Sequence, residues 1–259
     1  MIPAFVISLK EETARREAIS AHLKERGFEF EFFDAVDGRQ MDVLKHPDYD
    51  ATKRRAAHGR DLKPGELGCL LSHRNIYEEI VKRNLDIALI LEDDARLHED
   101  TKAVLEALLK KNITFDLIRL LGSPKVAKGK HRKIAKLFKD FWLVRLRTTP
   151  GGAHATLVTR RGAKKLVKTT QKFAFPIDTI LGRGWETGID AYSIQPGLAV
   201  QDLSFESAIG EERHDKTAVP KNLKFKFTRL VFKIGEAAGK AQVYYANAPR
   251  DLATRKKFS

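Results

Sequence analysis

The sequence has very little cysteine and no long hydrophobic run. Its 259 residues include a single cysteine, Cys69, which excludes an internal disulfide framework and suits a reducing compartment. No stretch approaches the roughly 18 apolar residues that a membrane span requires. A secretory signal is also not evident, because an apolar segment begins at residue 4 without a basic region before it. A cytoplasmic location is therefore expected.

The composition, 42% hydrophobic and 32% charged residues, is typical of a globular protein with a substantial core. The formal net charge of +14 is concentrated in two segments. Residues 123–147 contain nine Lys or Arg and one acid, residues 221–259 contain ten and two, and the rest of the chain sums to −2. Such segments bind polyanions, so nucleic acid, acidic phospholipid and phosphorylated glycolipid are candidate partners, with a solvated basic surface as the alternative.

Apolar segments alternate with segments of helical periodicity, which favours an α/β sheet covered by helices. Strands are predicted at residues 4–7, 28–33, 87–91, 115–121, 141–146, 153–159 and 190–194, and helices at 11–26, 64–83, 100–111 and 161–169. Two segments are predicted to lack regular structure. The polar residues 41–61 are expected to form a mobile or ligand-ordered loop, and the basic residues 125–139 to lie over the surface.

The most informative segment is the apolar run at residues 87–91, which ends in Glu92, Asp93 and Asp94. A short continuous apolar run is typical of a strand buried on both faces, and ligands bind beyond the carboxyl ends of such strands. Side chains alternate along a strand, so Glu92 and Asp94 are expected on one face and Asp93 on the other. Paired carboxylates suit a hard divalent cation, whereas a helix cap is the structural alternative.

Several segments resemble glycosyltransferase family 25, the lipooligosaccharide galactosyltransferases and their relatives. The segments are FVISL (5–9) with Arg15 and Arg16 after it, FDAVDG (33–38), PGELGCLLSH (64–73), ALILEDD (88–94), GGAHATLVTRRGA (151–163), PID (176–178), and Gln195-Pro196 through residues 207–209. The resemblance covers about the first 210 residues. Ser8 departs from it where the family commonly has Asn, as do His154 and Thr156 in a strand that more often carries an aromatic residue.

The resemblance implies a GT-A-like, Rossmann-type mixed sheet over residues 1–210, followed by a basic helical tail over 211–259. It also implies an inverting transfer of a hexose, most often galactose, from a UDP-sugar to a sugar hydroxyl of a lipooligosaccharide- or lipopolysaccharide-type acceptor. A divalent cation, Mn²⁺ or Mg²⁺, would stabilise the charge that develops on the diphosphate leaving group. We expect Glu92 and Asp94 to bind this cation.

Inversion in one step requires a base near the acceptor hydroxyl. Asp178 is the candidate, because it belongs to the family-like PID element and is predicted to follow a helix in a loop. Glu186 and Asp190 compete with it, and a helix-capping role for Asp178 is the structural alternative.

The remaining expected site residues contact the nucleotide sugar. They are Ser8, Leu9, Arg15, Arg16, Val36, Asp37, Gly38, Asp93 and Gly152. An arginine fork binds phosphate or ribose, whereas two solvated helix residues are the alternative for Arg15 and Arg16. Asp37 and Gly38 would approach the nucleoside or simply form a turn. His73 is interpreted as a packed or supporting residue rather than a ligand, since no second His or Cys stands at zinc-ligand spacing.

The tail is predicted to form a basic amphipathic helix. Its apolar stripe comprises Phe227, Leu230, Val231, Ile234 and Ala238, flanked by Lys and Arg. Such a helix lies on an anionic membrane or docks its stripe on the domain, and both alternatives stay open. Two further functions are weighed: a family member that binds a sugar nucleotide or glycolipid without catalysis, and a nucleic-acid-binding protein. The second is disfavoured, because most Phe residues fall in predicted core strands instead of among the basic residues.

Overall fold

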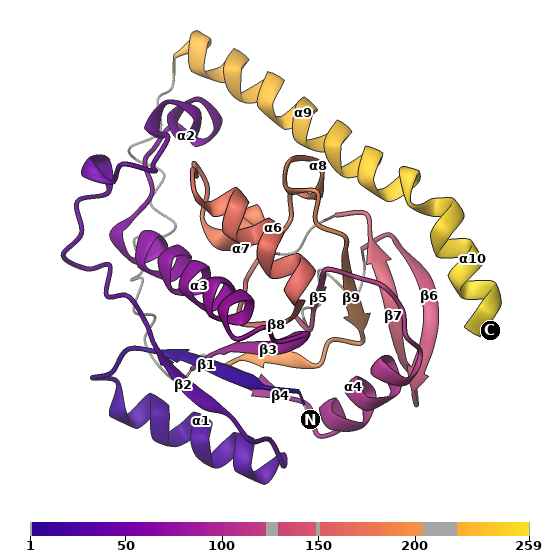
Figure 1. Ribbon diagram of the computed structural model, residues 1–259. Coiled ribbons are helices and arrows are strands. Elements are labelled where there is room, and N and C mark those ends of the chain that lie inside the picture. Colours follow the sequence, from indigo (N-terminus) through magenta and orange to yellow (C-terminus); the bar gives the residue numbers. More distant parts are fainter. Residues whose placement is uncertain (1, 123–128, 149–150, 203, 205–221, 259) are drawn as a thin grey trace.

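The core of the computed structural model is an eight-stranded mixed sheet with helices on both faces (Figure 1). The structure describes residues 2–122, 129–148, 151–202, 204 and 222–258. Along the sheet the strands lie in the order β2-β1-β3-β8-β5-β9-β7-β6. Their bounds are β1 (Ala4–Ser8), β2 (Glu31–Asp34), β3 (Ile87–Glu92), β5 (Leu117–Arg119), β6 (His131–Phe138), β7 (Phe141–Leu146), β8 (Ala155–Thr159) and β9 (Ala191–Gln195). The predicted α/β fold, a large mixed sheet flanked by helices, is confirmed.

The directions of the strands bring the ends of several of them to one edge of the sheet. β1 runs parallel to both β2 and β3, whereas β8 runs antiparallel to β3 and to β5. The carboxyl ends of β1, β2, β3 and β5 therefore meet the amino end of β8. Two short strands that the sequence did not indicate, β4 (Ala95–Leu97) and β10 (Ala199–Gln201), form a small antiparallel sheet. Ligands typically bind at the edge of an α/β sheet where the carboxyl ends of its strands lie, here those of β1, β2, β3 and β5.

Helices bury β3 from both sides, as its apolar run predicts. α1 (Thr13–Glu25) and α4 (Thr101–Lys110) cover one face, and α3 (Pro64–Lys82), α6 (Arg160–Thr170) and α7 (Ile177–Ile180) cover the other (Figure 1). Leu89 and Leu91 belong to the core beneath α1 and α4, while Ile90 belongs to the core beneath α3 and α6. Alternate residues of one strand thus fill two cores.

The expected loop at residues 41–61 is wrong, because this polar segment contains the 3-10 helix η1 (Val43–Lys45) and the α-helix α2 (Ala51–His58). Asp50 caps α2 by accepting a hydrogen bond from the Lys53 amide at 2.8 Å. Arg54 is buried and lies 3.8 Å from the buried Glu66 carboxylate. The polar residues of this segment cap a helix and form a buried ion pair. Hydropathy alone does not distinguish such an ordered polar segment from a solvated loop.

The surface placement of the basic residues 125–139 is also wrong where the structure describes them, from residue 129 onward. Residues 131–138 form β6, which pairs antiparallel with β7 and buries Ile134 and Ala135. The register shifts between Lys133 and Ala135, so two successive residues are buried and the alternation of a regular strand is interrupted. Because of this irregularity, the sequence of β6 does not show the alternation of apolar and polar residues by which a strand is recognised.

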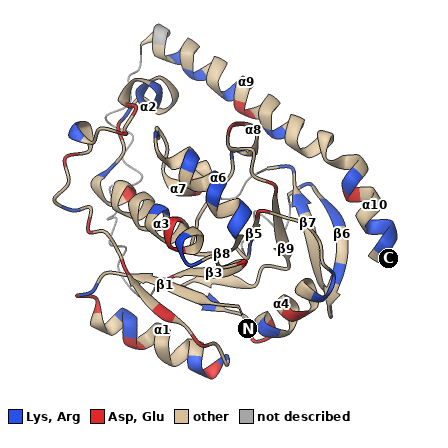
Figure 2. Cartoon of the chain, in the orientation of Figure 1, with Lys and Arg blue, Asp and Glu red and all other residues tan. Residues whose placement is uncertain are grey.

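The C-terminal residues form two helices, α9 (Leu223–Ala246) and α10 (Ala248–Phe258), that pack on the rest of the chain. α9 contacts α2 and α8 (Gly184–Thr187), and α10 contacts β6. Lys and Arg are frequent along α10 and β6 (Figure 2). The predicted boundary at residue 210 lies outside the described residues. Within the described part of the chain, we find no helix with the length and hydropathy needed to cross a membrane.

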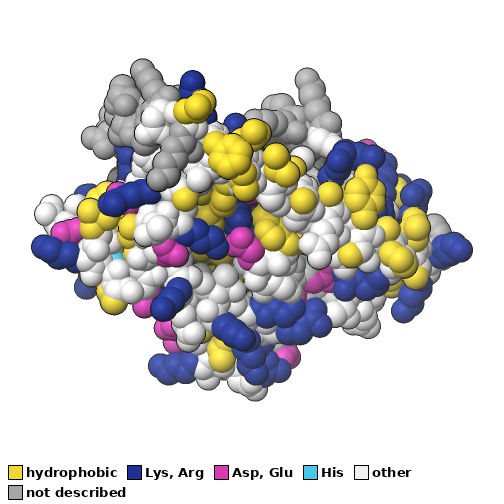
Figure 3. All heavy atoms as spheres, turned by 90° about the horizontal axis from the view of Figure 1, so that it is seen from above, with side chains coloured by type: hydrophobic (Ala, Val, Ile, Leu, Met, Phe, Trp, Pro, Cys, Tyr) yellow, Lys and Arg dark blue, Asp and Glu magenta, His cyan; other side chains and the backbone are white. Residues whose placement is uncertain are grey.

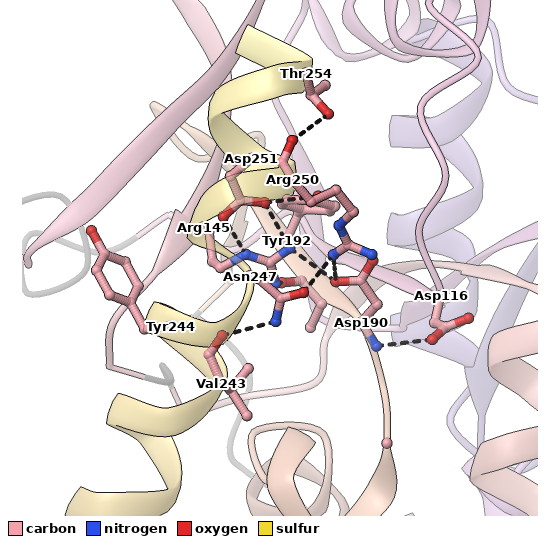
Figure 4. Close-up of polar contacts among 12 residues, drawn as sticks. Asp116, Arg145, Asp190, Tyr192, Val243, Tyr244, Asn247, Arg250, Asp251 and Thr254 are labelled. Carbon is pink, nitrogen blue, oxygen red and sulfur yellow. Dashed lines mark hydrogen bonds and ion pairs between the residues drawn. The ribbon is translucent and has the colours of Figure 1, made fainter.

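A buried charge network fastens α10 to the sheet (Figure 4). Asp251 is fully buried and accepts hydrogen bonds from Arg145 Nε at 2.7 Å and from the Tyr192 hydroxyl at 3.2 Å. It also accepts one from Arg132 Nη1 at 2.7 Å. Arg145 donates in turn to Asp190 at 2.9 Å. One carboxylate thus forms ion pairs with arginines of two strands, β6 and β7.

Replacing this carboxylate should destabilise the protein strongly. In Asp251→Asn the buried Arg145 loses its closest counter-charge, so the free energy of unfolding should fall by about 3–5 kcal/mol. Urea denaturation followed by circular dichroism measures the change. The control is Asp42→Asn, whose side chain is 51% exposed, and it should unfold at nearly the wild-type urea concentration. A loss no larger than that of the control would show that the network is dispensable.

Candidate active site

A cavity of about 400 Å³ opens at the sheet edge where the strand ends meet. Its walls come from the end of β1, the loop after β2, the start of α3, the end of β3, the segment before β8 and the start of α7. Eleven of the twelve predicted site residues line it: Ser8, Leu9, Arg15, Val36, Asp37, Gly38, Glu92, Asp93, Asp94, Gly152 and Asp178. Segments far apart in the sequence therefore form one concave surface.

Arg16 is the predicted site residue that does not line this cavity. Its guanidinium donates to the Ser8 carbonyl at 2.9 Å and to Asp34 at 2.5 Å, and it lies over the ring of Phe32. These contacts join the ends of β1 and β2 from outside the cavity. Arg15 and Arg16, adjacent in sequence, thus point to different surroundings.

The three carboxylates at the end of β3 all line the cavity. Asp93 contacts Arg15 of α1 whereas Glu92 contacts His73 of α3, so the expected separation of Asp93 from Glu92 agrees with these contacts. β3 ends at Glu92 and residues 93–94 form a turn, and all three side chains reach the cavity. Asp93 is held by its neighbours on β1 and α1: Ser8 Oγ donates to Oδ2 at 2.7 Å and Arg15 Nε to Oδ1 at 2.8 Å. Its charge is therefore matched within the protein.

Glu92 is held on the α3 side of the cavity. Its Oε1 lies 3.2 Å from His73 Nε2 and 3.8 Å from Cys69 Sγ. His73 is fully buried, and the Tyr77 hydroxyl lies 3.4 Å from its other ring nitrogen. The expected supporting position of His73 agrees with these contacts.

Asp94 is the least compensated of the three acids. Burial, followed by the charge of Glu92, raises the pKa of its carboxyl to about 7. Its Oδ2 accepts a hydrogen bond from Gln201 Nε2 at 3.2 Å, and Arg15 lies 3.8 Å away. Its Oδ1 is buried and has no hydrogen-bond partner among the described residues. Such an oxygen beside a second carboxylate fits a bound divalent cation, which prefers oxygen ligands.

Asp178 lines the cavity from the first turn of α7 instead of from the expected loop. Its Oδ2 accepts a hydrogen bond from the Gly152 amide at 3.3 Å. The two competitors for the role of base do not line the cavity. Glu186 is paired with Arg183 at 2.7 Å, and Asp190 with Arg145 at 2.9 Å. Asp178 is thus the only one of the three that faces the cavity.

Arg119 is a supporting residue that sequence reasoning missed. Its Nη2 donates to the carbonyl of Asp178 at 2.7 Å and to that of Gly152 at 3.2 Å. Burial lowers the pKa of this arginine to about 10, which leaves it charged at neutral pH. The buried guanidinium therefore ties the two sides of the cavity wall together. A single arginine inside the apolar strand predicted at 115–121 was the available signal.

Gly38 lines the cavity and also has a packing role. A Cβ at this position would lie 2.0 Å from the Pro64 carbonyl oxygen and 2.9 Å from the Gly68 amide nitrogen. A Cβ on Gly68 would in turn lie 2.6 Å from the Val36 carbonyl oxygen. Two glycines therefore let the loop after β2 touch the first turns of α3. This contact sets the position of Val36 and Asp37 on the cavity wall.

The comparison with protein families follows the same segments. The model described as "Glycosyltransferase family 25 (LPS biosynthesis protein)" matches residues 1–181, which include the whole of β1 to α7. The chain belongs to glycosyltransferase family 25. The resemblance stated from the sequence motifs is thereby confirmed.

Relatives of this family 25 protein differ in activity. Procollagen galactosyltransferase 1-B of Xenopus laevis is 32% identical over 181 residues, which cover 63% of this chain and 27% of the relative. Inactive glycosyltransferase 25 family member 3 of Homo sapiens is 31% identical over 217 residues, covering 75% and 36%. A putative glycosyltransferase of Haemophilus influenzae is 27% identical over 250 residues, covering 89% and 85%. The chain thus spans about a third of the vertebrate relatives, and family membership alone does not decide catalysis.

The raised pKa of Asp94 predicts a pH-dependent stability in the absence of divalent cations. The folded-state pKa of about 7 lies above the ordinary value of 3.8, so the folded protein binds this proton more tightly than the unfolded chain. Stability should therefore decrease as the pH rises from about 4 to about 7. Asp94→Asn removes the buried charge, and it should melt at a higher temperature than the wild type at pH 8 but not at pH 4.

Thermal melts at both pH values, in buffer with a chelator, measure this difference. Asp93→Asn is the matched control and should melt below the wild type at pH 8, since it removes the partner of Arg15. An Asp94→Asn variant less stable than the wild type at pH 8 would contradict the burial argument.

Proposed function

We propose that this protein is an inverting glycosyltransferase. It transfers a hexose, with galactose the first candidate, from a UDP-sugar to a sugar hydroxyl of a lipooligosaccharide- or lipopolysaccharide-type acceptor. The observation that carries the proposal is the presence, in the lining of one cavity, of Asp94, which has a buried oxygen without a hydrogen-bond partner among the described residues, and of Asp178. A family member that only binds sugar nucleotide would not require both.

Asp94 and Glu92 would hold the divalent cation, Mn²⁺ or Mg²⁺. When bound, the cation stabilises the negative charge that develops on the diphosphate as the glycosidic bond breaks. Asp93 has its charge matched by Arg15, so its role is to fix that arginine at the cavity wall. The Arg15 guanidinium lines the cavity, and its fork is suited to binding phosphate oxygens.

The nucleoside end of the donor would lie against Ser8, Leu9 and the loop that carries Val36 to Gly38. Asp37 is bound to Arg39, whose hydrogen bond keeps the pKa of that carboxyl below its ordinary value. An ionised carboxylate at this position accepts hydrogen bonds from ribose hydroxyls or a base. Arg16 lies outside the cavity, and its proposed part is to fix the end of β1.

Asp178 would remove the proton of the acceptor hydroxyl as the hydroxyl oxygen attacks the sugar. The Gly152 amide orients the carboxylate by donating to Oδ2, and Arg119 holds the backbone of both residues. A base must lie within hydrogen-bonding reach of the proton that it takes, and the segment before β8 fixes that side of the cavity.

Replacing the base should separate chemistry from donor binding. In Asp178→Asn we expect turnover to fall by about 10²–10⁴-fold while the donor still binds, since only proton removal is lost. The assay uses a panel of UDP-sugars with an oligosaccharide acceptor in the presence of Mn²⁺, and calorimetry measures donor binding. Glu186→Gln, outside the cavity, is the control and should keep its activity. Near-normal turnover of Asp178→Asn would remove the assignment, and no turnover of any UDP-sugar by the wild type would favour the non-catalytic alternative.

The proposal includes a location on an anionic membrane, where a lipid-linked acceptor lies. α9 docks on the domain with one face, through Arg229 and Glu236, which contact the Ala57 carbonyl and Arg183. The predicted stripe is on another face. Its Phe227, Leu230, Val231 and Ile234 are 67%, 55%, 53% and 60% exposed. Figure 3 shows a row of hydrophobic side chains with Lys and Arg beside it. Exposed apolar residues flanked by Lys226 and Lys233 match a membrane of negative charge.

Point substitutions test this surface better than removal of the tail, which would also remove Asp251. Phe227→Glu combined with Ile234→Glu should abolish flotation with vesicles that contain phosphatidylglycerol. Leu252→Glu on α10, at a residue 49% exposed, is the control and should float like the wild type. Flotation of the double variant at wild-type levels would overturn the membrane assignment. A second result would also overturn it. If the wild type does not float but forms a dimer, and the double variant is monomeric, then a second copy of the chain covers the stripe.

A further inference from the structure

Three side chains of different chemistry place metal-binding atoms together at the inner wall of the cavity. Cys69 Sγ, a ring nitrogen of His73 and a carboxylate oxygen of Glu92 all lie within 4.8 Å of one another. The distance from Sγ to Oε1 is 3.8 Å and that from Nε2 to Oε1 is 3.2 Å. Tetrahedral zinc, with bonds of roughly 2.0–2.3 Å, places its ligand atoms about 3.3–3.6 Å apart. The two distances are close to this requirement.

The surrounding structure holds these atoms in place. Cys69 and His73 are four residues apart on α3, so they project from the same side of one rigid helix. Glu92 is the last residue of β3, a central strand. The Tyr77 hydroxyl, one further turn along α3, lies 3.4 Å from His73 Nδ1. A partner on the second ring nitrogen is the usual way in which a metal-binding histidine is oriented.

We propose that Cys69, His73 and Glu92 form a site for a zinc-like divalent ion. Thiolate and imidazole select Zn²⁺ over Mg²⁺ or Mn²⁺, so this site differs in chemistry from the oxygen site proposed at Glu92 and Asp94, although the two share Glu92. Binding would release the thiol proton to solvent and form the sulfur–metal bond. Cys69 and Glu92 line the cavity, so the fourth coordination position faces it. The proposal does not depend on glycosyl transfer.

The test uses Co²⁺, a spectroscopic substitute for Zn²⁺, with the full chain and no nucleotide sugar. Cys69 is the only cysteine in the chain, so a thiolate-to-cobalt charge-transfer band can arise only from this residue. We expect a tetrahedral cobalt spectrum with this band at one equivalent, displaced by Zn²⁺. Cys69→Ser should lose the band, and His73→Gln should weaken Co²⁺ binding at least about tenfold. His98→Gln, at a side chain 45% exposed and outside the cavity lining, should match the wild type.

Glu92→Gln provides a second test if the buried His73→Gln variant does not fold. Absence of the charge-transfer band at saturating Co²⁺ would overturn the proposal. A band that the available His73 and Glu92 variants leave unchanged would overturn it as well, because it would report the thiol alone. Activity is measured separately with Mn²⁺, so a failed metal site and a failed transferase assignment give different results.

Discussion

Three consecutive carboxylates at the end of a buried strand repel one another, and the architecture of the site depends on how each is compensated. Asp93 is matched by Arg15 and Ser8, and Glu92 is held beside His73 and Cys69. Asp94 keeps a buried oxygen without a partner among the described residues, and its pKa is raised by burial. The unequal compensation leaves the least satisfied charge facing the cavity, where a cation would be most strongly bound.

A second set of buried groups positions the walls around these acids. Arg119 donates to the carbonyls of Gly152 and Asp178, so it joins the segment before β8 to the start of α7. Gly38 and Gly68 join the loop after β2 to α3 by direct backbone contact. At the far end of the sheet, Asp251 fastens α10 to β6 and β7. The C-terminal helices are therefore packed on the sheet while the apolar stripe of α9 stays exposed.

Sequence patterns predicted most of the fold and the membership of the cavity. The uninterrupted apolar run before Glu92 indicated a strand buried on both faces, and that strand is central. Patterns failed where tertiary contacts decide the outcome. The bulge in β6 breaks the alternation, and the polar segment at 41–61 is ordered by the cap of Asp50 and the buried Arg54. The turn after Glu92 could not be seen from periodicity, although all three carboxylates line the cavity.

The supporting contacts of the site were the least predictable. Arg119 and Gln201 reach the site from β5 and β10, and only the folded chain shows that they lie beside Asp178 and Asp94. Arg16 illustrates the opposite error, because an arginine adjacent to a cavity residue in sequence can face away from it. Motifs identify which segments meet, whereas directions of individual side chains follow from packing and turns.

The most direct measurement of the central claim is a calorimetric titration of UDP into the full chain with and without Mn²⁺. The carboxylate site predicts one UDP per chain, bound much more tightly with Mn²⁺, and loss of that dependence in Asp94→Asn. UDP binding that is unaffected by Mn²⁺, or no UDP binding under either condition, would contradict the account.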